Sequence, residues 1–122
     1  MAISKIFYEY FSGRYSINLK LCDITLNRLN ISDATASVYN ELKELINRQS
    51  ETIETTLKVF PKDNQDIITK SYGKDKLTAD ALAKMYNTTP NHINKVRQKF
   101  TQSYKKNGGD VTSHHDILAK LH

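Results

Sequence analysis

The sequence of 122 residues contains one cysteine, Cys22, and no tryptophan. A single thiol cannot form an internal disulfide, so a small secreted domain held by disulfides is excluded. No apolar run approaches the roughly 18 residues that a membrane-spanning helix requires. The first residues include Glu9 and several aromatic side chains, unlike the basic and then apolar start of a signal peptide. We therefore expect a cytoplasmic protein with no membrane partner.

Glycine and proline are also scarce, with four and two residues, and they separate segments with helical patterns. Before Gly13, apolar residues recur at helical spacing within residues 2–12. Residues 15–31 fit either a strand or a helix, and we favour a helix because no partner strand is evident nearby. The predicted fold class is therefore all-α.

One long amphipathic helix is predicted over residues 34–59. Ser32 or Asp33 is suited to cap its N-terminus, because a side-chain oxygen there accepts from the exposed N–H groups of the first turn. From Val38 to Leu57, apolar side chains follow at steps of three and four. At about 1.5 Å per residue the helix would be roughly 39 Å long, which exceeds what a small globule needs. Its apolar stripe either packs on the preceding segments or forms a homodimer through residues 34–59.

Positive charge is concentrated in the second half of the chain. Lys and Arg number 18 against 13 Asp and Glu, so the net charge is +5. Residues 1–59 hold equal numbers of acidic and basic side chains, whereas no acidic residue lies between Asp80 and Asp110. A basic stretch of this kind is typical of a surface that binds a polyanion. An ordinary solvated helix face explains the charge pattern equally well, so the local structure has to decide.

Two helices joined by a turn of about three residues are predicted in and just before this basic stretch. Thr78 is suited to cap a short helix over residues 79–86. Asn87 tolerates the left-handed conformation in which helices often end. Thr89 and Pro90 then indicate the start of a second helix, since proline is favoured at the first helical position.

The second helix has an apolar face formed by Ile93, Val96 and Phe100, and an opposite face rich in amides and lysines. This pattern is typical of a helix-turn-helix, in which the N-terminal end of the second helix meets base edges in the major groove. Asparagine pairs with adenine, and lysine reaches guanine or phosphate. The predicted base-reading residues are Asn91, His92, Asn94 and Lys95. The complete predicted DNA-binding set, which adds phosphate-contacting positions, is Thr78, Thr89, Asn91, His92, Asn94, Lys95, Gln98, Lys99, Lys105 and Lys106.

Residues 60–106 resemble the fourth conserved region of sigma-70 family factors. Phe60-Pro61 is similar to the Leu-Pro that opens that region, and Tyr72-Gly73 to the Tyr-Gly that follows its first helix. Residues 77–83, Leu-Thr-Ala-Asp-Ala-Leu-Ala, are similar to its Leu-Ser-x-x-x-Ile-Ala helix. The resemblance implies a helix-turn-helix that binds promoter DNA. The family's base-contacting positions correspond here to Pro90, Asn91, His92, Asn94 and Lys95.

The family usually has Arg or Lys at several positions where this sequence has Pro90, His92 and Asn94, so a −35-like recognition sequence is not carried over. Residues 1–59 are shorter and more neutral than the promoter-melting region of a full sigma factor. The chain therefore resembles phage and mobile-element transcription regulators of the ArpU and RinA type. That resemblance implies that the N-terminal helices dimerise or engage a partner.

Three regions are predicted: residues 1–59 for dimerisation or partner binding, 60–107 for DNA binding, and 108–122 as a flexible tail. No catalytic set, cofactor motif or metal site is evident, since neither Cys22 nor His114-His115 has ligands at zinc spacing. The predicted function is that of a sequence-specific transcription regulator that binds double-stranded DNA and is not an enzyme. The alternative is an adaptor or inhibitor that engages RNA polymerase or another host factor.

Overall fold

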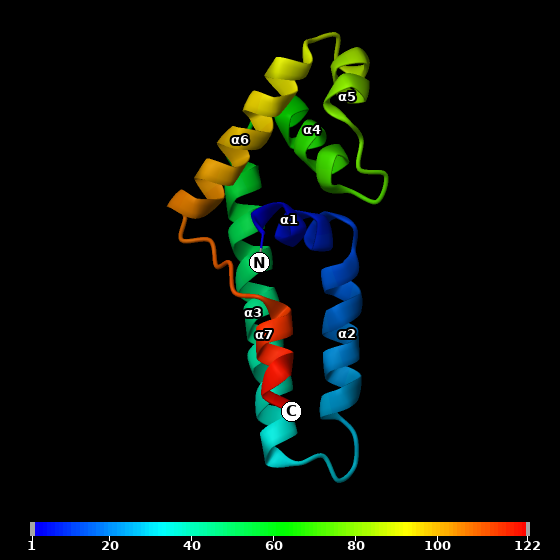
Figure 1. Cartoon of the computed structure of the whole chain (residues 1–122), viewed down its shortest axis with the longest axis vertical. Coiled ribbons are helices and arrows are strands. Elements are labelled where there is room, and N and C mark those ends of the chain that lie inside the picture. The colour runs from blue at the N-terminus through cyan, green and yellow to red at the C-terminus, as the bar shows by residue number, and fades with distance from the viewer. Residues whose placement is uncertain (1, 122) are drawn as a thin grey trace.

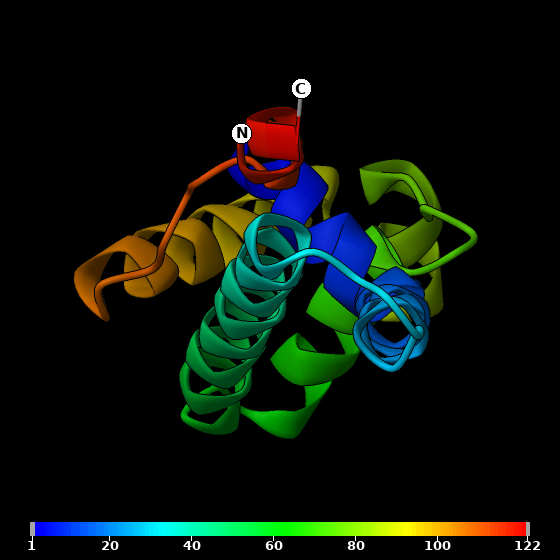
Figure 2. The ribbon, with the colours of Figure 1, turned by 90° about the horizontal axis from the view of Figure 1, so that it is seen from below.

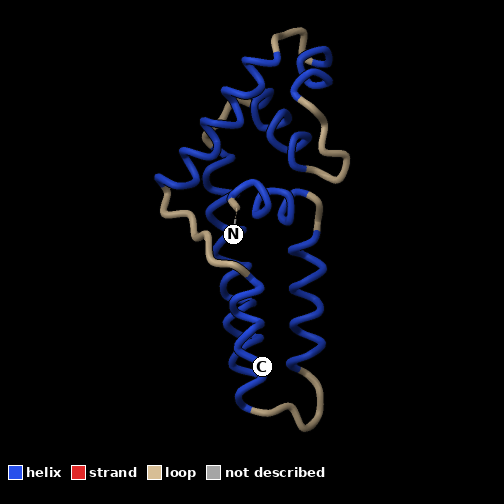
Figure 3. Tube along the Cα trace, viewed as in Figure 1, coloured by secondary structure: helices blue, strands red, loops and turns tan. Residues whose placement is uncertain are grey.

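The computed structural model describes residues 2–121, and within them every regular element is helical, which confirms the all-α fold class (Figure 3). The elements are α1 (Ile3–Phe11), α2 (Arg14–Leu26), α3 (Asp33–Lys58), α4 (Lys62–Tyr72), α5 (Ala79–Met85), α6 (Pro90–Lys106), α7 (His114–Leu118) and the short 3-10 helix η1 (Ala119–Leu121). Figure 1 shows an elongated molecule with α2, α3 and α7 along its long axis and α4, α5 and α6 at one end. Over residues 2–121, none of the helices has both the length and the apolar character needed to cross a membrane.

Helix α2 runs antiparallel to α3 and carries apolar side chains on both of its faces (Figure 1). Tyr15 and Cys22 are buried, whereas Ile17, Leu21 and Ile24 are each more than half exposed. Because apolar residues occupy the exposed face as well as the buried one, the helix lacks the usual difference between an apolar and a polar face. This is the physical reason why the spacing of apolar residues alone did not distinguish a helix from a strand here.

Helix α3 begins after Ser32, whose hydroxyl oxygen accepts a hydrogen bond from the backbone N–H of Thr35 at 3.1 Å. The helix packs against α1, α2, α6 and α7, and α2 and α7 lie on different sides of it (Figure 2). Its inward side chains are Val38, Leu42, Leu45, Ile46, Gln49, Ile53 and Thr56. These side chains of the predicted apolar stripe are therefore buried within one chain, and a homodimer through residues 34–59 stays a prediction.

One hydrophobic core connects the first helix with the helices at the far end of the chain. Phe7 of α1 is fully buried, and its ring centroid lies 4.7 Å from that of Phe100 and 5.2 Å from that of Tyr104, both on α6. Tyr72 of α4 packs edge-on against the same ring at 5.2 Å. Edge-to-face aromatic pairs add stabilisation beyond the area that they bury. Residues 1–59 and 60–107 therefore share one core through α1.

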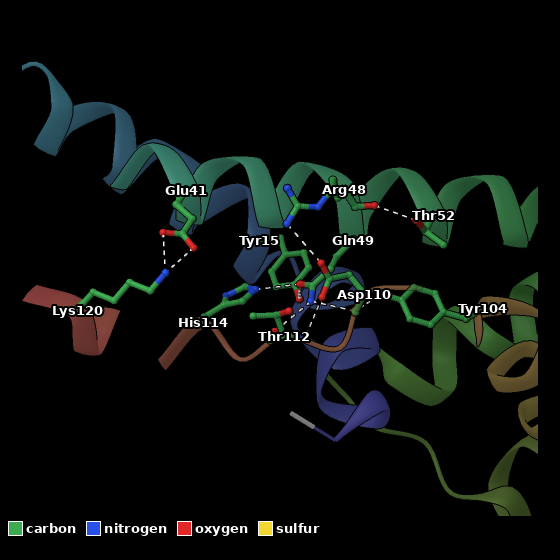
Figure 4. A network of polar contacts seen from close by, with 10 residues as sticks. All are labelled: Tyr15, Glu41, Arg48, Gln49, Thr52, Tyr104, Asp110, Thr112, His114 and Lys120. Atoms are coloured by element: carbon green, nitrogen blue, oxygen red, sulfur yellow. Dashed lines mark hydrogen bonds and ion pairs between the residues drawn. The ribbon is translucent and has the colours of Figure 1, made fainter. Parts of the chain in front are cut away.

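Within the flexible tail predicted over residues 108–122, residues 114–121 form α7 and η1, which pack along α3, and residue 122 lies outside the described residues. Ile117 of α7 is 3% exposed. The fully buried Gln49 side chain donates hydrogen bonds from Nε2 to the carbonyl oxygens of Asp110 and Thr112, at 3.1 and 3.3 Å (Figure 4). A buried amide is costly unless its donors find acceptors. The tail supplies those acceptors, which is a physical reason for its ordered position.

Candidate nucleic-acid interface

Helices α5 and α6 both begin at a threonine cap. The hydroxyl oxygens of Thr78 and Thr89 accept hydrogen bonds from backbone N–H groups in the first turns of α5 and α6, at 3.1 and 3.2 Å. Pro90 is the first residue of α6, and Asn87 has a φ of 51°, in the left-handed region. Both caps, the proline position and the left-handed asparagine agree with the sequence-based predictions, which are confirmed at this local level.

One face of α6 is buried over its whole length. Ile93, Val96, Phe100 and Tyr104 have exposed fractions of 2% or less. Their spacing of three and four residues places them on one side of the helix. Burial of this side fixes the rotation of α6 about its axis, and thereby decides which side chains face solvent.

All of the predicted DNA-binding side chains are exposed. Asn91, Asn94, Lys95 and Gln98 follow one another at i, i+3, i+4 and i+7, so they form one continuous stripe along the outer face of α6. His92 and Lys99, seven residues apart, lie on the same side of this stripe, next to Lys95. Lys105, seven residues after Gln98, lies on the same face in the last turn of α6, whereas Thr78 lies at the start of α5, Thr89 at the start of α6, and Lys106 beside Lys105.

Grooves border α6 on two sides of this stripe. A groove of about 630 Å³ between α6 and the end of α4 is lined by Asn94, Gln98, Lys105 and Tyr72, among others. A second hollow of about 530 Å³ lies between α5 and the start of α6, next to Asn87. Asn94 and Gln98 of the stripe therefore line the first groove, and the second hollow lies before the first turn of α6.

Arg97 has a role that the charge pattern did not reveal. Its Nε donates to Oγ of Ser71 at 3.0 Å, and its Nη2 donates to the carbonyl oxygen of Leu77 at 2.9 Å. Ser71 belongs to α4 and Leu77 precedes α5, so one planar guanidinium joins α6 to two other segments. A sequence signal for this was present, because Arg97 follows the buried Val96 and lies four residues after Ile93, at the edge of the inward face.

The charge around the stripe is positive. Helix α6 carries several lysines and one arginine and has no acidic residue. On the neighbouring α4, the ammonium of Lys70 donates to the Tyr86 hydroxyl at 2.8 Å, and this hydrogen bond raises the pKa of Lys70. The hydrogen bond places this ammonium beside Tyr86, at the end of α5. Fixed positive charge next to exposed amides suits contact with an anionic polymer.

Metal binding and thiol chemistry find no support in the residues described. Over positions 2–121, no group of three or more His, Cys, Asp or Glu side chains is placed to hold a metal ion. Cys22 is buried, and burial raises the pKa of its thiol, which keeps it in the unreactive protonated form. His114 stacks on Tyr15 at a centroid distance of 5.1 Å and contacts Gln49, so its ring belongs to a packed network.

Comparison of the chain with protein-family models, with curated proteins and with solved structures found no match. A function for this chain is therefore inferred from its own residues and their arrangement.

Proposed function

We propose that the chain is a sequence-specific DNA-binding transcription regulator, in which α5 and α6 act as a helix-turn-helix and α6 enters the major groove. The observation that carries the proposal is the exposed stripe of Asn91, Asn94, Lys95 and Gln98 on a helix whose opposite face is buried. In this class of motif, the N-terminal turns of the second helix meet the base edges.

Each side chain of the stripe has a chemistry that suits this role. The amides of Asn91 and Asn94 offer a donor and an acceptor side by side, which matches the major-groove edge of adenine. The ammonium of Lys95 matches the acceptors of guanine. Lys105 and Lys106 lie at the far end of α6, about 21 Å from its first turn at 1.5 Å per residue, a distance suited to phosphate contact beside the groove.

A helix that contacts bases must also be held at a fixed angle to the helices on which it packs, because hydrogen bonds to base edges require accurate positions. The hydrogen bonds of Arg97 to Ser71 and to the carbonyl of Leu77 supply such a constraint from outside α5. The capped turn around Asn87 supplies a second one. These contacts support the proposal because they hold the stripe rigid before any partner binds, which lowers the entropy cost of binding.

The experiment that tests the proposal begins with selection of duplexes from a random library by the full chain. Affinity for the selected duplex and for a scrambled one is then measured by fluorescence anisotropy at several salt concentrations. For each tenfold rise in salt concentration, we expect log K to fall by about 0.9 times the number of phosphate contacts. Asn94→Ala and Lys95→Ala should each weaken binding to the selected duplex by roughly 1–3 kcal/mol, with less effect on the scrambled one.

Lys20→Ala is the matched control, because Lys20 is an exposed lysine of α2 and lies outside the stripe. It should leave the affinity for both duplexes unchanged. Failure of the selection to enrich any sequence, or equal losses in the Lys20 and Lys95 variants, would contradict the proposal. If the chain binds no duplex but retains RNA polymerase from a nuclease-treated extract, the adaptor function replaces it.

A further inference from the structure

A cavity of about 460 Å³ lies between α1, the end of α4 and the loop that leads to α5. Its rim carries Lys5, Arg14 and Lys76, all exposed, and Ser71 in its wall is buried. We propose that this cavity binds a small anion bearing phosphate groups, and that the bound anion adjusts the position of α6. The regulatory meaning of this site rests on the proposed function, whereas the binding itself does not.

The charges of the cavity favour a multivalent anion. The three cations come from three different segments, namely α1, the start of α2 and the loop between α4 and α5. The wall contains one carboxylate, that of Glu9, whose Oε1 lies 3.7 Å from Nη1 of Arg14. The net charge of the lining side chains is positive. A cavity lined mainly by charges of one sign concentrates the electrostatic field inside it. The volume is within the usual range for small-molecule sites.

Lys76 is held above the cavity in an unusual conformation. Its φ of 44° lies in the left-handed region, which residues with a side chain rarely adopt. Its Nζ lies 4.0 Å from the centroid of the Tyr8 ring, in a cation–π contact. Its backbone N–H donates to the carbonyl of Gly73 at 3.1 Å. Because Tyr8 and Lys76 both line the cavity, the contact between them holds the ammonium at the cavity wall.

The wall of the cavity is connected directly to α6. Ser71 lines the cavity, and its hydroxyl accepts the hydrogen bond from Nε of Arg97. Leu77 follows Lys76 in the chain, and its carbonyl accepts the second hydrogen bond of Arg97. An anion that draws Lys76 inward therefore moves an acceptor on which the orientation of α6 depends. Both acceptors of Arg97 thus belong to, or adjoin, residues that would contact the ligand.

The phosphate groups that occupy the cavity can belong either to a free compound or to the backbone of a bound duplex. The small cavity of about 460 Å³, with the buried Ser71 in its wall, favours a free compound, because a duplex is too wide to enter it. The two sources are separated by using pyrophosphate as the small probe and a duplex as the large one.

The test is a titration of the ¹⁵N-labelled full chain with sodium pyrophosphate, followed by NMR at constant ionic strength, with sodium chloride as the reference salt. We expect saturable shifts of the amides of Tyr8, Lys76 and Leu77 and of the Arg97 Nε–Hε signal. Lys76→Ala should weaken binding about tenfold or more, and Lys74→Ala, an exposed lysine of the same loop outside the cavity wall, should change it by less than about twofold.

Several results would overturn this inference: no saturable shift, equal weakening in the Lys74 and Lys76 variants, or shifts confined to the first turns of α6. A response of the cavity amides with an unchanged Arg97 signal would overturn the connection to α6. A duplex that shifts Lys76 when pyrophosphate does not would assign the site to backbone phosphate, which also overturns it. If Lys76→Ala loses the folded spectrum, Arg14→Gln tests the same cavity from α2.

Anisotropy with the selected duplex separates this inference from the proposed function. Saturating pyrophosphate should change the affinity of the unmodified chain for DNA and leave that of the Lys76 variant unchanged. If the chain binds no DNA, the proposed function fails, while saturable shifts at Lys76 and Arg97 still support the anion site.

Discussion

Nε of Arg97 donates to Oγ of Ser71 at 3.0 Å, which joins the middle of α6 to the end of α4. Because the same guanidinium also reaches the carbonyl of Leu77, it fixes α6 to the segment that leads into α5. The most basic helix of the chain therefore uses one of its cations for internal support and presents the others to solvent.

Substitution of Arg97 by lysine should lower the free energy of unfolding by about 1–3 kcal/mol, although the charge is kept. A lysine cannot reproduce the planar fork, so at least one of the two acceptors loses its partner. Urea denaturation followed by circular dichroism measures this change. Lys99→Ala, an exposed change on the same helix, should stay within about 0.5 kcal/mol of the unmodified chain, and equal effects in both variants would contradict this role of Arg97.

Gln49 should be the most sensitive polar residue of the core. Its amide joins α3 to the C-terminal segment through Asp110 and Thr112, and its Oε1 accepts from the Tyr15 hydroxyl. Gln49→Leu removes the acceptor of the buried Tyr15 hydroxyl and one donor to each of the Asp110 and Thr112 carbonyls, so we expect a loss of roughly 2–4 kcal/mol in the free energy of unfolding.

Hydrogen exchange should then show faster exchange in α7 of the Gln49 variant, since the amide is its principal buried polar connection to α3. Asn47→Ala, an exposed neighbour, is the matched control. Unchanged protection of α7 in Gln49→Leu would show that apolar contacts such as Ile117 suffice.

The stability of the C-terminal segment should decrease in mild acid through His114. Nε2 of His114 lies 2.9 Å from Oε1 of Gln49, and it must be the donor because that oxygen can only accept. Burial, and then the nearby positive charge of Lys5, lower the pKa of His114 below its usual 6.5.

The folded state therefore binds fewer protons at His114 than the unfolded state does as the pH falls below about 6.5. The contribution of the neutral ring is present above that pH and is lost progressively below it, down to the pKa of the folded state. Free energies of unfolding measured from pH 7.5 downward should show this loss, and His114→Gln, which keeps an N–H donor, should flatten it. An identical slope in both proteins would assign the pH dependence to other groups.

Asn87 should tolerate glycine and not alanine. Its φ of 51° is costly for a residue whose side chain cannot form local hydrogen bonds, by roughly 1–2 kcal/mol. Thermal unfolding should therefore show Asn87→Ala destabilised by about 1 kcal/mol and Asn87→Gly close to the unmodified chain. A destabilised glycine variant together with a neutral alanine variant would show that the asparagine side chain acts in another way.

Local features of this fold were predictable from the sequence because their causes lie within a few residues. Thr89 determines the start of α6 as its N-cap, and Pro90 contributes through its fixed φ. Asn87 ends α5 because it adopts the left-handed conformation. The residues that form the exposed stripe followed from the inward spacing of Ile93 and Val96.

Features that depend on distant partners were not predictable in this way. The position of the C-terminal segment depends on Gln49, whose acceptor at Asp110 lies 61 residues away in sequence. The internal role of Arg97 depends on Ser71, 26 residues away. Helix α2 gave an ambiguous pattern because an exposed apolar row accompanies its buried one, and burial is a property of the assembled core.

The most direct test of the central claim is an NMR titration of the ¹⁵N-labelled chain with the selected duplex, in which the side-chain NH₂ signals of Asn91 and Asn94 are followed. The proposed function predicts that both signals shift and that their exchange with water slows, since each amide becomes enclosed against a base edge. Unchanged Asn91 and Asn94 signals in a complex that is otherwise formed would contradict the claim that α6 reads DNA.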